Sequence, residues 1–306
     1  MAAQFPRREH TGTPPRRQAG ASAAPRRRAD EAPERRREPS PARRDPETRR
    51  AADAPRDTSW EGAAAWYDTH QGEKGDDFYS VLILPAVERL LGSKRGHHVL
   101  DVACGQGVLG RHLAKQGVRT TGVDASPTLL AKASERAGAL ETYVTGDARQ
   151  LDQSLAGQRF DAAALVLALQ DLDPIAPVLA GVSAHLKPGA RVVMVMTHPC
   201  FRIPRRAGWA YDETDGVQYR RIGGYLSPSA APVRIHPGMP ADTGSTTTFH
   251  RPLSVYLNAC GAAGLGVVAC EELCSHRRGT KGPRYGAEDL AMKEIPLFIA
   301  LAAVRL

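Results

Sequence analysis

Apolar and polar residues follow two alternating patterns between residues 97 and 196. Short apolar runs of the kind that form buried strands are HHVLDV, RTTGVDA, LETYVTG, RFDAAALVLAL and RVVMVM. Between these runs, apolar residues recur three and four positions apart, which predicts helices. Strands that alternate with helices in this way form a mostly parallel sheet with helices on both faces. The chain is therefore predicted to have an α/β fold.

Residues that start and stop helices mark several boundaries. Ser126 and Pro127 suit an N-cap and a first helical position, and Gly138 lies just past the predicted end of that helix. The segment PIAPVLAGVSAHLKPG predicts a helix that closes at Pro188 and Gly189. Further predicted elements are helices at AAAWYDTH, FYSVLILPAVERLLG and SVYLNACGAAG and closing strands at GLGVVACEEL and EIPLFIALAAVRL.

The alternation of strands and helices breaks after the fifth strand. About fifty residues rich in Gly, Pro, Arg and Tyr separate that strand from the next predicted helix. Ordinary connections in α/β folds are much shorter, and long ordered loops commonly serve as lids or binding loops. We expect residues 199–248 to form a lid or acceptor-binding insertion.

The first 58 residues differ in composition from the rest of the chain. They contain 15 arginines, no lysine and nine acidic residues, a net charge of +6 out of +8 for the whole chain. They show no apolar periodicity and contain one aromatic residue, Phe5, so they cannot bury enough apolar surface to offset the entropy of ordering. We predict a disordered tail over residues 1–58 and one folded domain over residues 59–306.

The remaining residues carry 26 basic and 24 acidic side chains, so the folded domain is nearly neutral. Any nucleic-acid binding is therefore expected to depend on the arginine-rich tail. No run approaches the ~18 apolar residues of a membrane span. No apolar stretch suits a secretory signal, and nine acids in the tail argue against an organelle transit peptide. We expect a cytoplasmic protein without membrane segments, and its oligomeric state stays open.

Five cysteines occur, and three metal-binding residue types lie close together in CEELCSH. Cys270, Cys274 and His276 fit the spacing of one zinc-ligand pair only loosely, and a second pair is missing. An odd number of cysteines without a signal peptide also argues against a disulfide framework. Small apolar cysteines on a strand are the better interpretation, and we expect no metal site.

A glycine-rich turn follows the first predicted strand. The segment VLDVACGQGVLGRHLA places Gly105, Gly107 and Gly110 between a strand and a helix. This spacing matches the dinucleotide-binding pattern G-x-G-x-x-G, in which the backbone approaches a ligand at a helix N-terminus. Several nucleotide-containing ligands use such a turn, so the spacing alone is a weak signal. A nicotinamide-dependent dehydrogenase is one interpretation of it.

Acidic residues follow the first three predicted strands. Asp101 lies four residues before Gly105, where its charge would oppose a pyrophosphate but suit an ammonium group. Asp124 ends the second strand, where an acid can accept hydrogen bonds from both ribose hydroxyls. Asp147 ends the third strand, and its carboxylate can accept a hydrogen bond from an adenine amino group. Together these acids favour an adenosyl ligand that carries an ammonium group.

Five segments, VLDVACGQG, TGVDAS, TGDARQL, FDAAALVLALQDLDP and HLKPGARVVMV, resemble in order and spacing the class I S-adenosylmethionine-dependent methyltransferases. The resemblance is strong over residues 60–200 and weaker over the closing strands. It implies a Rossmann-like, seven-stranded sheet whose last strand is antiparallel. It also implies S-adenosylmethionine as the cofactor. The chain departs from the family at Ala103, where glycine is frequent.

The resemblance also implies how the cofactor is bound. Asp101 and the glycine turn would hold the methionine end, Asp124 the ribose, and Asp147 the adenine. A carbonyl near the end of the fourth strand would face the methionine ammonium. The segment AAAWYDTH resembles an aromatic-Tyr-Asp segment that many of these enzymes fold over the cofactor, although a core aromatic would also suit Tyr67. The expected cofactor-binding residues are Tyr67, Asp101, Ala103, Gly105, Gly107, Asp124, Ala125, Asp147, Ala148 and Leu165.

The stretch THPCFRIPRRAGWAYDE begins where the fifth strand ends, at the edge of the sheet where ligands bind in α/β folds. His198 is the first candidate base for a hydroxyl or ammonium acceptor, and a histidine that only bonds the backbone is the alternative. His250 is the second candidate base. Aromatic and guanidinium groups in this region suit a flat or anionic acceptor. The candidate substrate-binding residues are Gln170, Arg202, Trp209, Tyr225 and Arg251.

The leading functional hypothesis is an enzyme that methylates a small molecule on oxygen or nitrogen. Related enzymes that methylate nucleobase or glutamine amino groups typically carry an Asn/Asp-Pro-Pro-aromatic motif after the fourth strand, where this chain has ALQDLDP. An RNA or protein methyltransferase that docks through the tail is the first alternative. A cofactor-binding protein without catalysis and a nicotinamide-dependent dehydrogenase are the others.

Overall fold

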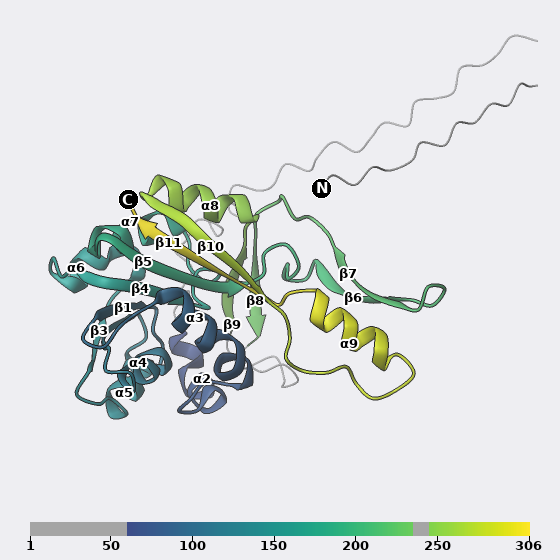
Figure 1. The fold of residues 1–306 in the computed structure, drawn as a ribbon, viewed down its shortest axis with the longest axis horizontal. Coiled ribbons are helices and arrows are strands. Elements are labelled where there is room, and N and C mark those ends of the chain that lie inside the picture. The colour runs from purple at the N-terminus through teal and green to yellow at the C-terminus, as the bar shows by residue number, and fades with distance from the viewer. Residues whose placement is uncertain (1–59, 235–244) are drawn as a thin grey trace, which may run out of the picture. The chain divides into compact units, whose positions relative to one another are not determined.

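The computed structural model describes residues 60–234 and 245–306. The predicted tail, residues 1–58, lies outside these ranges, as does part of the predicted insertion. The described residues form a seven-stranded sheet in the order β10-β11-β5-β4-β1-β2-β3 (Figure 1). Its strands are β1 (His98–Val102), β2 (Arg119–Asp124), β3 (Glu141–Thr145), β4 (Phe160–Val166), β5 (Leu186–Thr197), β10 (Leu265–Leu273) and β11 (Phe298–Arg305).

The strands run mostly parallel, as the sequence predicts. β1 pairs in parallel with β2 and β4, β2 with β3, and β4 with β5. The last strand, β11, is antiparallel to both of its neighbours, β5 and β10. The predicted mostly parallel sheet with an antiparallel last strand is therefore confirmed.

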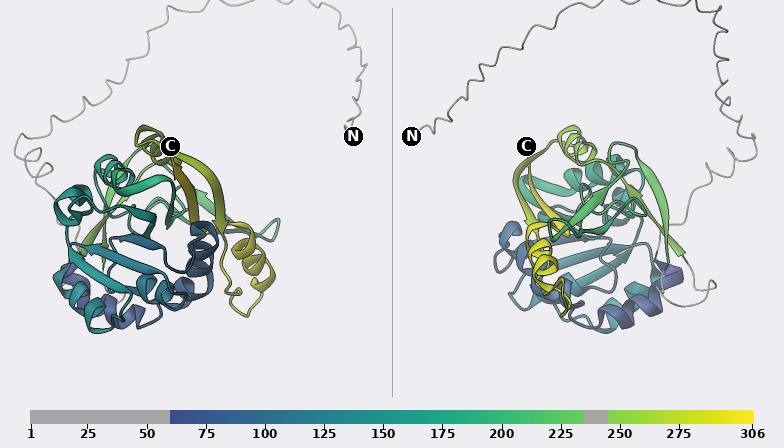
Figure 2. Two further views of the ribbon diagram at one scale, coloured as in Figure 1. Left: turned by 60° about the vertical axis from the view of Figure 1, so that its left-hand side comes forward. Right: turned by 90° about the vertical axis from the view of Figure 1, so that its right-hand side faces the viewer.

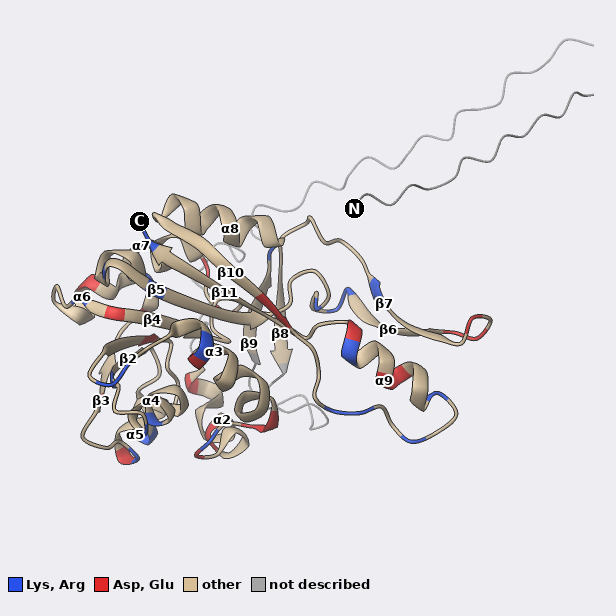
Figure 3. Ribbon diagram, viewed as in Figure 1, with Lys and Arg blue, Asp and Glu red and all other residues tan. Residues whose placement is uncertain are grey.

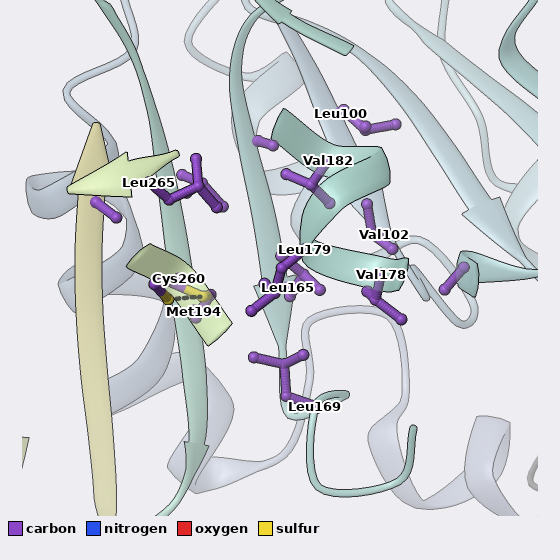
Figure 4. Close-up of a cluster of buried hydrophobic side chains, with 14 of the residues drawn as sticks. Leu100, Val102, Leu165, Leu169, Val178, Leu179, Val182, Met194, Cys260 and Leu265 are labelled. Atoms are coloured by element: carbon purple, nitrogen blue, oxygen red, sulfur yellow. Dashed lines mark hydrogen bonds between the residues drawn. The ribbon is translucent and has the colours of Figure 1, made fainter. Parts of the chain in front are cut away.

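Side chains alternate strictly between the two faces of the sheet, because successive residues of a strand point to opposite sides. On β4, Ala163 and Leu165 join one apolar cluster, whereas Ala162 and Ala164 join another. The first cluster packs under α6 (Leu151–Leu155), α7 (Ile175–His185) and α8 (Leu253–Ala262). Figure 4 shows side chains of α7 among those of β1 and β4, with Cys260 of α8 against Met194 of β5.

The second apolar cluster covers the other face of the sheet. It brings η2 (Tyr79–Ile83), α3 (Leu84–Leu91) and α4 (Val108–Ala114) against β1, β4, β5 and β11. Figure 2 shows these helices on the side of the sheet away from α7 and α8. Helices on both faces leave the ends of the strands as the edge at which polar side chains can gather.

Helix α5 (Pro127–Glu135) begins as its sequence predicts. The Ser126 side chain accepts a hydrogen bond of 3.1 Å from the amide of Leu129, and Pro127 takes the first position. This capping satisfies one of the free amides at a helix start. The helix ends at Glu135, so Gly138 lies beyond it.

Two boundaries differ from the prediction. Helix α7 ends at His185, and β5 begins at Leu186 rather than after Gly189. The reason is that Leu186 already pairs with Phe160 of β4, and a register shift follows before Ala162. The buried His185 ring bonds the Gln158 carbonyl at 2.9 Å, which fixes the point where helix gives way to strand.

The predicted insertion consists of two antiparallel strand pairs rather than one loop. β6 (Ala207–Asp212) pairs with β7 (Val217–Ile222), and β8 (Ser229–Arg234) pairs with β9 (Ser245–His250). A helix absent from the prediction, α9 (Tyr285–Glu294), packs beside β7 (Figure 1). Basic and acidic residues are interspersed along the ribbon in Figure 3, and the turn of the β6–β7 hairpin is acidic.

Among residues 60–234 and 245–306, no helix has the length and apolar character that a bilayer span requires.

Candidate functional site

A cavity of about 330 Å³ lies where the ends of β1, β2, β4 and β5 meet the helical segment that precedes the sheet. One wall consists of the turns that follow β1, β2 and β3, and the other consists of α2 (Ala64–Gln71) and the loop after β4. The lining residues are Trp60, Tyr67, Gln71, Ala103, Gly105, Val123, Asp124, Ala125, Leu129, Gly146, Asp147, Ala148, Arg149, Val166, Leu167, Ala168, Gln170, Asp171, Leu172 and Thr197.

The glycine turn after β1 is held in a backbone conformation that side chains disfavour. Ala103, Gly105 and Gly107 have φ angles of 55°, 55° and 80°. A Cβ on Gly107 would lie 2.3 Å from the Tyr143 hydroxyl oxygen, so the glycine there is required by packing against β3. Gly105 lines the cavity beside Tyr67, whereas Gly107 does not. The turn therefore exposes its backbone to the cavity at Gly105.

Asp124, at the end of β2, organises this turn. Its Oδ2 atom accepts a hydrogen bond of 2.7 Å from the Gly105 amide, and its Oδ1 atom accepts one of 2.9 Å from the Ser126 amide. Burial raises the pKa of Asp124, and these amides oppose that effect. A carboxylate has about four lone-pair positions, so two remain for a ligand that brings paired hydroxyls.

Asp147 and Arg149 follow β3 as a second polar group in the cavity wall. The Arg149 guanidinium donates to both Asp147 oxygens, at 3.0 Å and 2.7 Å for Oδ2 and 2.9 Å for Oδ1. This pairing lowers the pKa of Asp147. Asp147 is thus an ionised acceptor at neutral pH, and a ligand amino group would share it with Arg149. Ala148, next to it, is buried and also lines the cavity.

Asp101 lies behind the glycine turn rather than in the cavity wall. It is 3 % exposed, in the middle of the sheet between Gly122 of β2 and Ala164 of β4. Burial, followed by the charge of Asp124, raises the pKa of Asp101 to about 7. A buried carboxyl of this kind is costly to ionise unless a cation approaches it.

The segment before the sheet folds over the cavity and is tied to it by ionic contacts. Arg136, at the end of α5, donates to both oxygens of Asp68 on α2, at 2.5 Å and 2.8 Å, and to the side-chain Oε1 atom of Gln106 at 2.7 Å. Gln106 in turn donates to the Gly72 carbonyl at 2.5 Å. These bonds connect α2 to the glycine turn, and we call Arg136, Asp68 and Gln106 the clamp.

The clamp positions Tyr67, which points into the cavity. The Tyr67 ring lies 5.3 Å from that of Trp60, and burial together with nearby acids raises its pKa, so it stays neutral. Tyr67 therefore lies where the aromatic-Tyr-Asp resemblance expects it, and Asp68, the next residue, is the acid of that segment.

Breaking the clamp is expected to weaken binding of S-adenosylhomocysteine about tenfold. Each of Arg136→Gln and Asp68→Asn removes a largely buried, bidentate pair, and the double variant should be no weaker than either, since one interaction is lost in all three. Calorimetric titration measures these affinities. Lys132→Gln is the matched control because its pair with Glu135, also on α5, is exposed. Equal affinity in wild type and variants would show that α2 contributes nothing to binding.

The loop after β4 forms the wall opposite the glycine turn. Arg251 donates to the Leu169 and Leu172 carbonyls at 3.3 Å and 2.6 Å and to Asp173 at 2.7 Å. The Phe249 amide donates to the Gln170 carbonyl at 2.6 Å. Arg251 is 6 % exposed and does not line the cavity, so it holds the loop in place rather than facing a ligand.

Gln170 and Asp171 are the polar residues that this loop presents to the cavity. The Gln170 side-chain amide donates to the Leu167 carbonyl, while its Oε1 atom is buried without a partner among the described residues. Asp171 is 8 % exposed, and burial raises its pKa to about 7 against hydrogen bonds from groups that include Trp60 and Gln170. Asp171 is not among the site residues predicted from the sequence, although the segment QDLDP at the end of a buried strand carries two acids.

The candidate base His198 is held by bonds on both ring nitrogens. It is 1 % exposed, its Nε2 atom lies 2.8 Å from Oε1 of Glu272 on β10, and its Nδ1 atom accepts from the Cys200 amide at 3.2 Å. Burial lowers the pKa of His198 against the opposing effect of Glu272. The neighbouring Thr197 lines the cavity, but His198 does not. This geometry favours an anchoring role between β5 and β10 over proton transfer.

The remaining candidates for acceptor contact also lie outside the cavity lining. His250 bonds the Tyr225 carbonyl at 2.7 Å, and the Tyr225 hydroxyl accepts from the Leu253 amide at 3.0 Å. Trp209 is exposed on β6 beneath the Arg220 guanidinium, and Arg202 is exposed after β5. Only Gln170 of the five candidate substrate-binding residues lines the cavity.

Leu165, one of the expected cofactor-binding residues, does not line the cavity. It is fully buried in the core cluster under α7, and its backbone pairs with Met194. β4 ends one residue later, and Val166, Leu167 and Ala168 line the cavity instead. The alternation of the strand turns the Leu165 side chain into the core, and a ligand-facing carbonyl near this strand end stays a prediction.

Within the described parts of the chain, no three His, Cys, Asp or Glu residues gather to hold a metal ion. Cys270 is exposed on β10, and His276 bonds Asp77 at 2.7 Å. All five cysteines are free.

Comparison with known proteins places this geometry in a family. Residues 99–189 match the family model of a methyltransferase domain. The chain is similar to a ubiquinone biosynthesis O-methyltransferase of Alkalilimnicola ehrlichii, with 35 % identity over 136 residues, 43 % of this chain and 54 % of that protein. A crystal structure of an S-adenosylmethionine-dependent methyltransferase from Mesorhizobium loti aligns with a TM-score of 0.58 and 28 % identity over 72 % of this chain and 96 % of the other.

Residues 99–189 are therefore a methyltransferase domain, and the chain shares its fold with S-adenosylmethionine-dependent methyltransferases. S-adenosylmethionine is the cofactor of this family, and the donor set of the cavity fits it. Asp124 has acceptor positions left for hydroxyls, Gly105 exposes backbone, and the unpaired charge of Asp101 would suit an ammonium group. The dehydrogenase interpretation of the glycine turn is therefore not supported.

Another relative of this methyltransferase is also named after a quinone. A demethylmenaquinone methyltransferase of Tropheryma whipplei is 33 % identical over 112 residues, 36 % of this chain and 46 % of that protein. The chain thus spans about half the length of the curated relatives that it matches. The segment that matches the family model, residues 99–189, includes the glycine turn, Asp124 and Asp147.

Proposed function

We propose that this methyltransferase transfers a methyl group from S-adenosylmethionine to an oxygen or nitrogen atom of a small molecule. One observation carries the proposal: a single cavity joins the wall of Gly105, Asp124 and Asp147 to a separate wall of Tyr67, Gln170 and Asp171. The first wall suits an adenosyl group, and the second leaves polar and aromatic groups for an acceptor. Pockets that enclose both partners in this way are typical of small ligands.

The family's cofactor supplies a methyl group on a positively charged sulfur, which is already reactive toward a nucleophile. The chain has to bind the acceptor, align it for displacement and exclude water. Helix α2 and Trp60 cover the cavity, and Gln170 offers an acceptor atom for a donor on the substrate. Positioning of this kind, together with a proton acceptor, supplies the catalysis that the residues in the cavity can provide.

The curated relatives named above support a small acceptor, since their names refer to ubiquinone biosynthesis and demethylmenaquinone. Docking of RNA or protein through the arginine-rich tail is less well supported, because that tail lies outside the described residues and no relative named above carries such an acceptor. We place the reaction in the cytoplasm as part of the same proposal.

Formation of S-adenosylhomocysteine by the purified full-length chain tests the proposal. We expect calorimetric binding of S-adenosylmethionine in the micromolar range and methyl transfer to at least one member of a panel of phenols, carboxylates and amines. Transfer to bulk RNA or protein with none to the panel would contradict the small-molecule assignment. Binding of NADH in place of the adenosyl ligands would contradict the cofactor assignment.

A further inference from the structure

We propose that Asp171 is the catalytic base of this site and that its substrate is a ring-bound hydroxyl group, a phenol or hydroquinone, oriented by Gln170. The proposal rests on the proposed function and names the acceptor class for it. It replaces His198 and His250, whose ring nitrogens bond groups outside the cavity lining.

The placement of Asp171 is the first support. Asp171 lies on the wall opposite Gly105 and Asp124, on the loop that Arg251 and β9 hold in place. Trp60 and Gln170 donate hydrogen bonds to its carboxylate, while the Thr248 hydroxyl donates to the Gln170 carbonyl at 3.2 Å. Two donors leave about two of four lone-pair positions for a group in the cavity. The carboxylate is therefore fixed in orientation and still able to accept a proton.

The hydrogen-bonding character of the wall is the second support. Asp171 and the Oε1 atom of Gln170 are both acceptors, and the latter is buried without a partner among the described residues. Such an atom costs free energy until a donor reaches it. The ligand must therefore bring hydrogen-bond donors to this wall, as a hydroxyl group does.

The surrounding rings and apolar side chains define the rest of the acceptor. Trp60, Tyr67 and Leu172 line the same part of the cavity, and the Trp60 and Tyr67 rings lie 5.3 Å apart. Apolar and aromatic walls favour a flat ring over a polar chain. A phenol has a pKa near 10 and needs a base at neutral pH, whereas a carboxylate would hold an amine in its unreactive ammonium form.

The reaction is balanced without any further reagent. The hydroxyl's oxygen–hydrogen bond breaks and the proton passes to an Asp171 oxygen. An oxygen–carbon bond forms as the sulfur–carbon bond of the methyl donor breaks, and that bond's electron pair stays on sulfur. Asp171 then returns its proton to water.

The charged and titratable groups that face Asp171 come from helices α2 and α8 and from the segment just before α8. Arg251, before α8, favours the ionised carboxylate, whereas Tyr67 of α2 and Tyr256 of α8 are themselves affected by its charge. Burial raises the pKa of both tyrosines, so they stay neutral over the working range. Burial raises the pKa of Asp171 to about 7, so the fraction of active base should increase with pH through that value.

The experiment compares wild type, Asp171→Asn and Asp215→Asn as full-length proteins. Asp215 is an exposed acid in the β6–β7 turn and serves as the matched control. The probes are catechol, 3,4-dihydroxybenzoate and 1,4-naphthalenediol, with phenethylamine and aniline as the amine arm. S-adenosylhomocysteine formation is followed from pH 5.5 to 9, and binding of S-adenosylhomocysteine is measured separately by calorimetry.

We expect wild type and Asp215→Asn to methylate a hydroxyl probe with a rate that rises through pH 7. Asp171→Asn should lower kcat about 10²–10³-fold, remove that inflection and leave S-adenosylhomocysteine binding within about threefold. If the variant does not bind S-adenosylhomocysteine, the wild-type profile decides: an inflection near pH 7 supports the proposal and a flat profile overturns it.

Three other results would overturn the proposal. Near-normal kcat in Asp171→Asn would show that Asp171 is not the catalytic base. Turnover of the amine probes alone would show that the acceptor is not a hydroxyl group. If the protein binds S-adenosylhomocysteine but methylates none of the probes, the assignment of a hydroxyl acceptor is also contradicted. Wild type that binds neither adenosyl ligand would instead refute the proposed function itself, which keeps the two failures distinguishable.

Discussion

Replacing Asp124 by alanine is expected to weaken binding of S-adenosylmethionine and S-adenosylhomocysteine at least a hundredfold. The carboxylate holds the glycine turn through the Gly105 and Ser126 amides and has lone pairs left for two hydroxyls of the ligand. Hydrogen bonds to a charged group contribute about 1.5–3 kcal/mol each. Losing two of them to the ligand corresponds to a hundredfold to ten-thousandfold change in Kd. Calorimetric titration of both ligands measures the effect.

The matched control for Asp124→Ala is Asp212→Ala. Asp212 also accepts two backbone hydrogen bonds, from Thr214 and Asp215, but it lies in the β6–β7 turn outside the cavity lining. Its variant should bind both ligands like wild type. Asp124→Asn, which keeps one carbonyl oxygen, should fall between wild type and alanine. Unchanged affinity in Asp124→Ala would mean that Asp124 only caps the turn.

The cofactor wall could be predicted from sequence because strand ends fix it. Asp124 and Asp147 directly follow apolar runs, and the ends of parallel strands meet at one edge of a sheet. Which side of the sheet a side chain faces is harder to predict than the strand itself. Leu165 was expected near the cofactor, but its side chain packs in the core because β4 continues to Val166.

The bonding partners of His198 and Asp171 could not be predicted from the sequence because they come from distant segments. Glu272, which bonds His198, lies 74 residues farther along the chain. Trp60 and Thr248 lie beside Asp171 in the fold, although one comes far before it and the other far after it in the sequence. A local pattern can offer an acid at a strand end, but it cannot show which acid is buried.

The sequence of the insertion contains a hairpin pattern that the prediction of one long loop did not use. GWAYDETDGVQYRRI alternates aromatic and polar residues around a turn rich in Asp and Gly, which is typical of a hairpin. The structure places β6 and β7 there. Helix α9 follows a stretch of Gly, Pro and Arg and carries few apolar residues, so its periodicity is weak. Its packing beside β7 depends on tertiary contact rather than on pattern.

Replacing Asp101 by asparagine is expected to stabilise the ligand-free protein at pH 8 while weakening cofactor binding. Burial and the charge of Asp124 raise the pKa of Asp101 to about 7, well above the value of about 3.9 for an unfolded chain. The folded state therefore prefers the protonated form. The stability gained from that preference is complete below the unfolded pKa and is lost as the pH rises through about 7.

Asparagine has nearly the same size and no charge, so it removes the cost of holding a buried carboxylate at high pH. We expect the Tm of Asp101→Asn to exceed that of wild type by about 3–8 °C at pH 8 and by much less at pH 5. S-adenosylhomocysteine binding should weaken about 10–100-fold, since the variant cannot attract an ammonium group. Thermal denaturation and calorimetry at both pH values measure the two effects.

Asp161→Asn, on the same sheet, is expected to change Tm at pH 8 in the opposite direction. Burial raises the pKa of Asp161, but the Lys187 ammonium at 2.5 Å and the His98 amide outweigh it, so its folded pKa lies below the ordinary value. That carboxylate contributes stability above the unfolded pKa, and its removal should lower Tm at pH 8. A lower Tm for Asp101→Asn at pH 8 as well would show that Asp101 is compensated in the ligand-free fold. The carboxyl behind the glycine turn would then be a structural group rather than a charge kept for the cofactor.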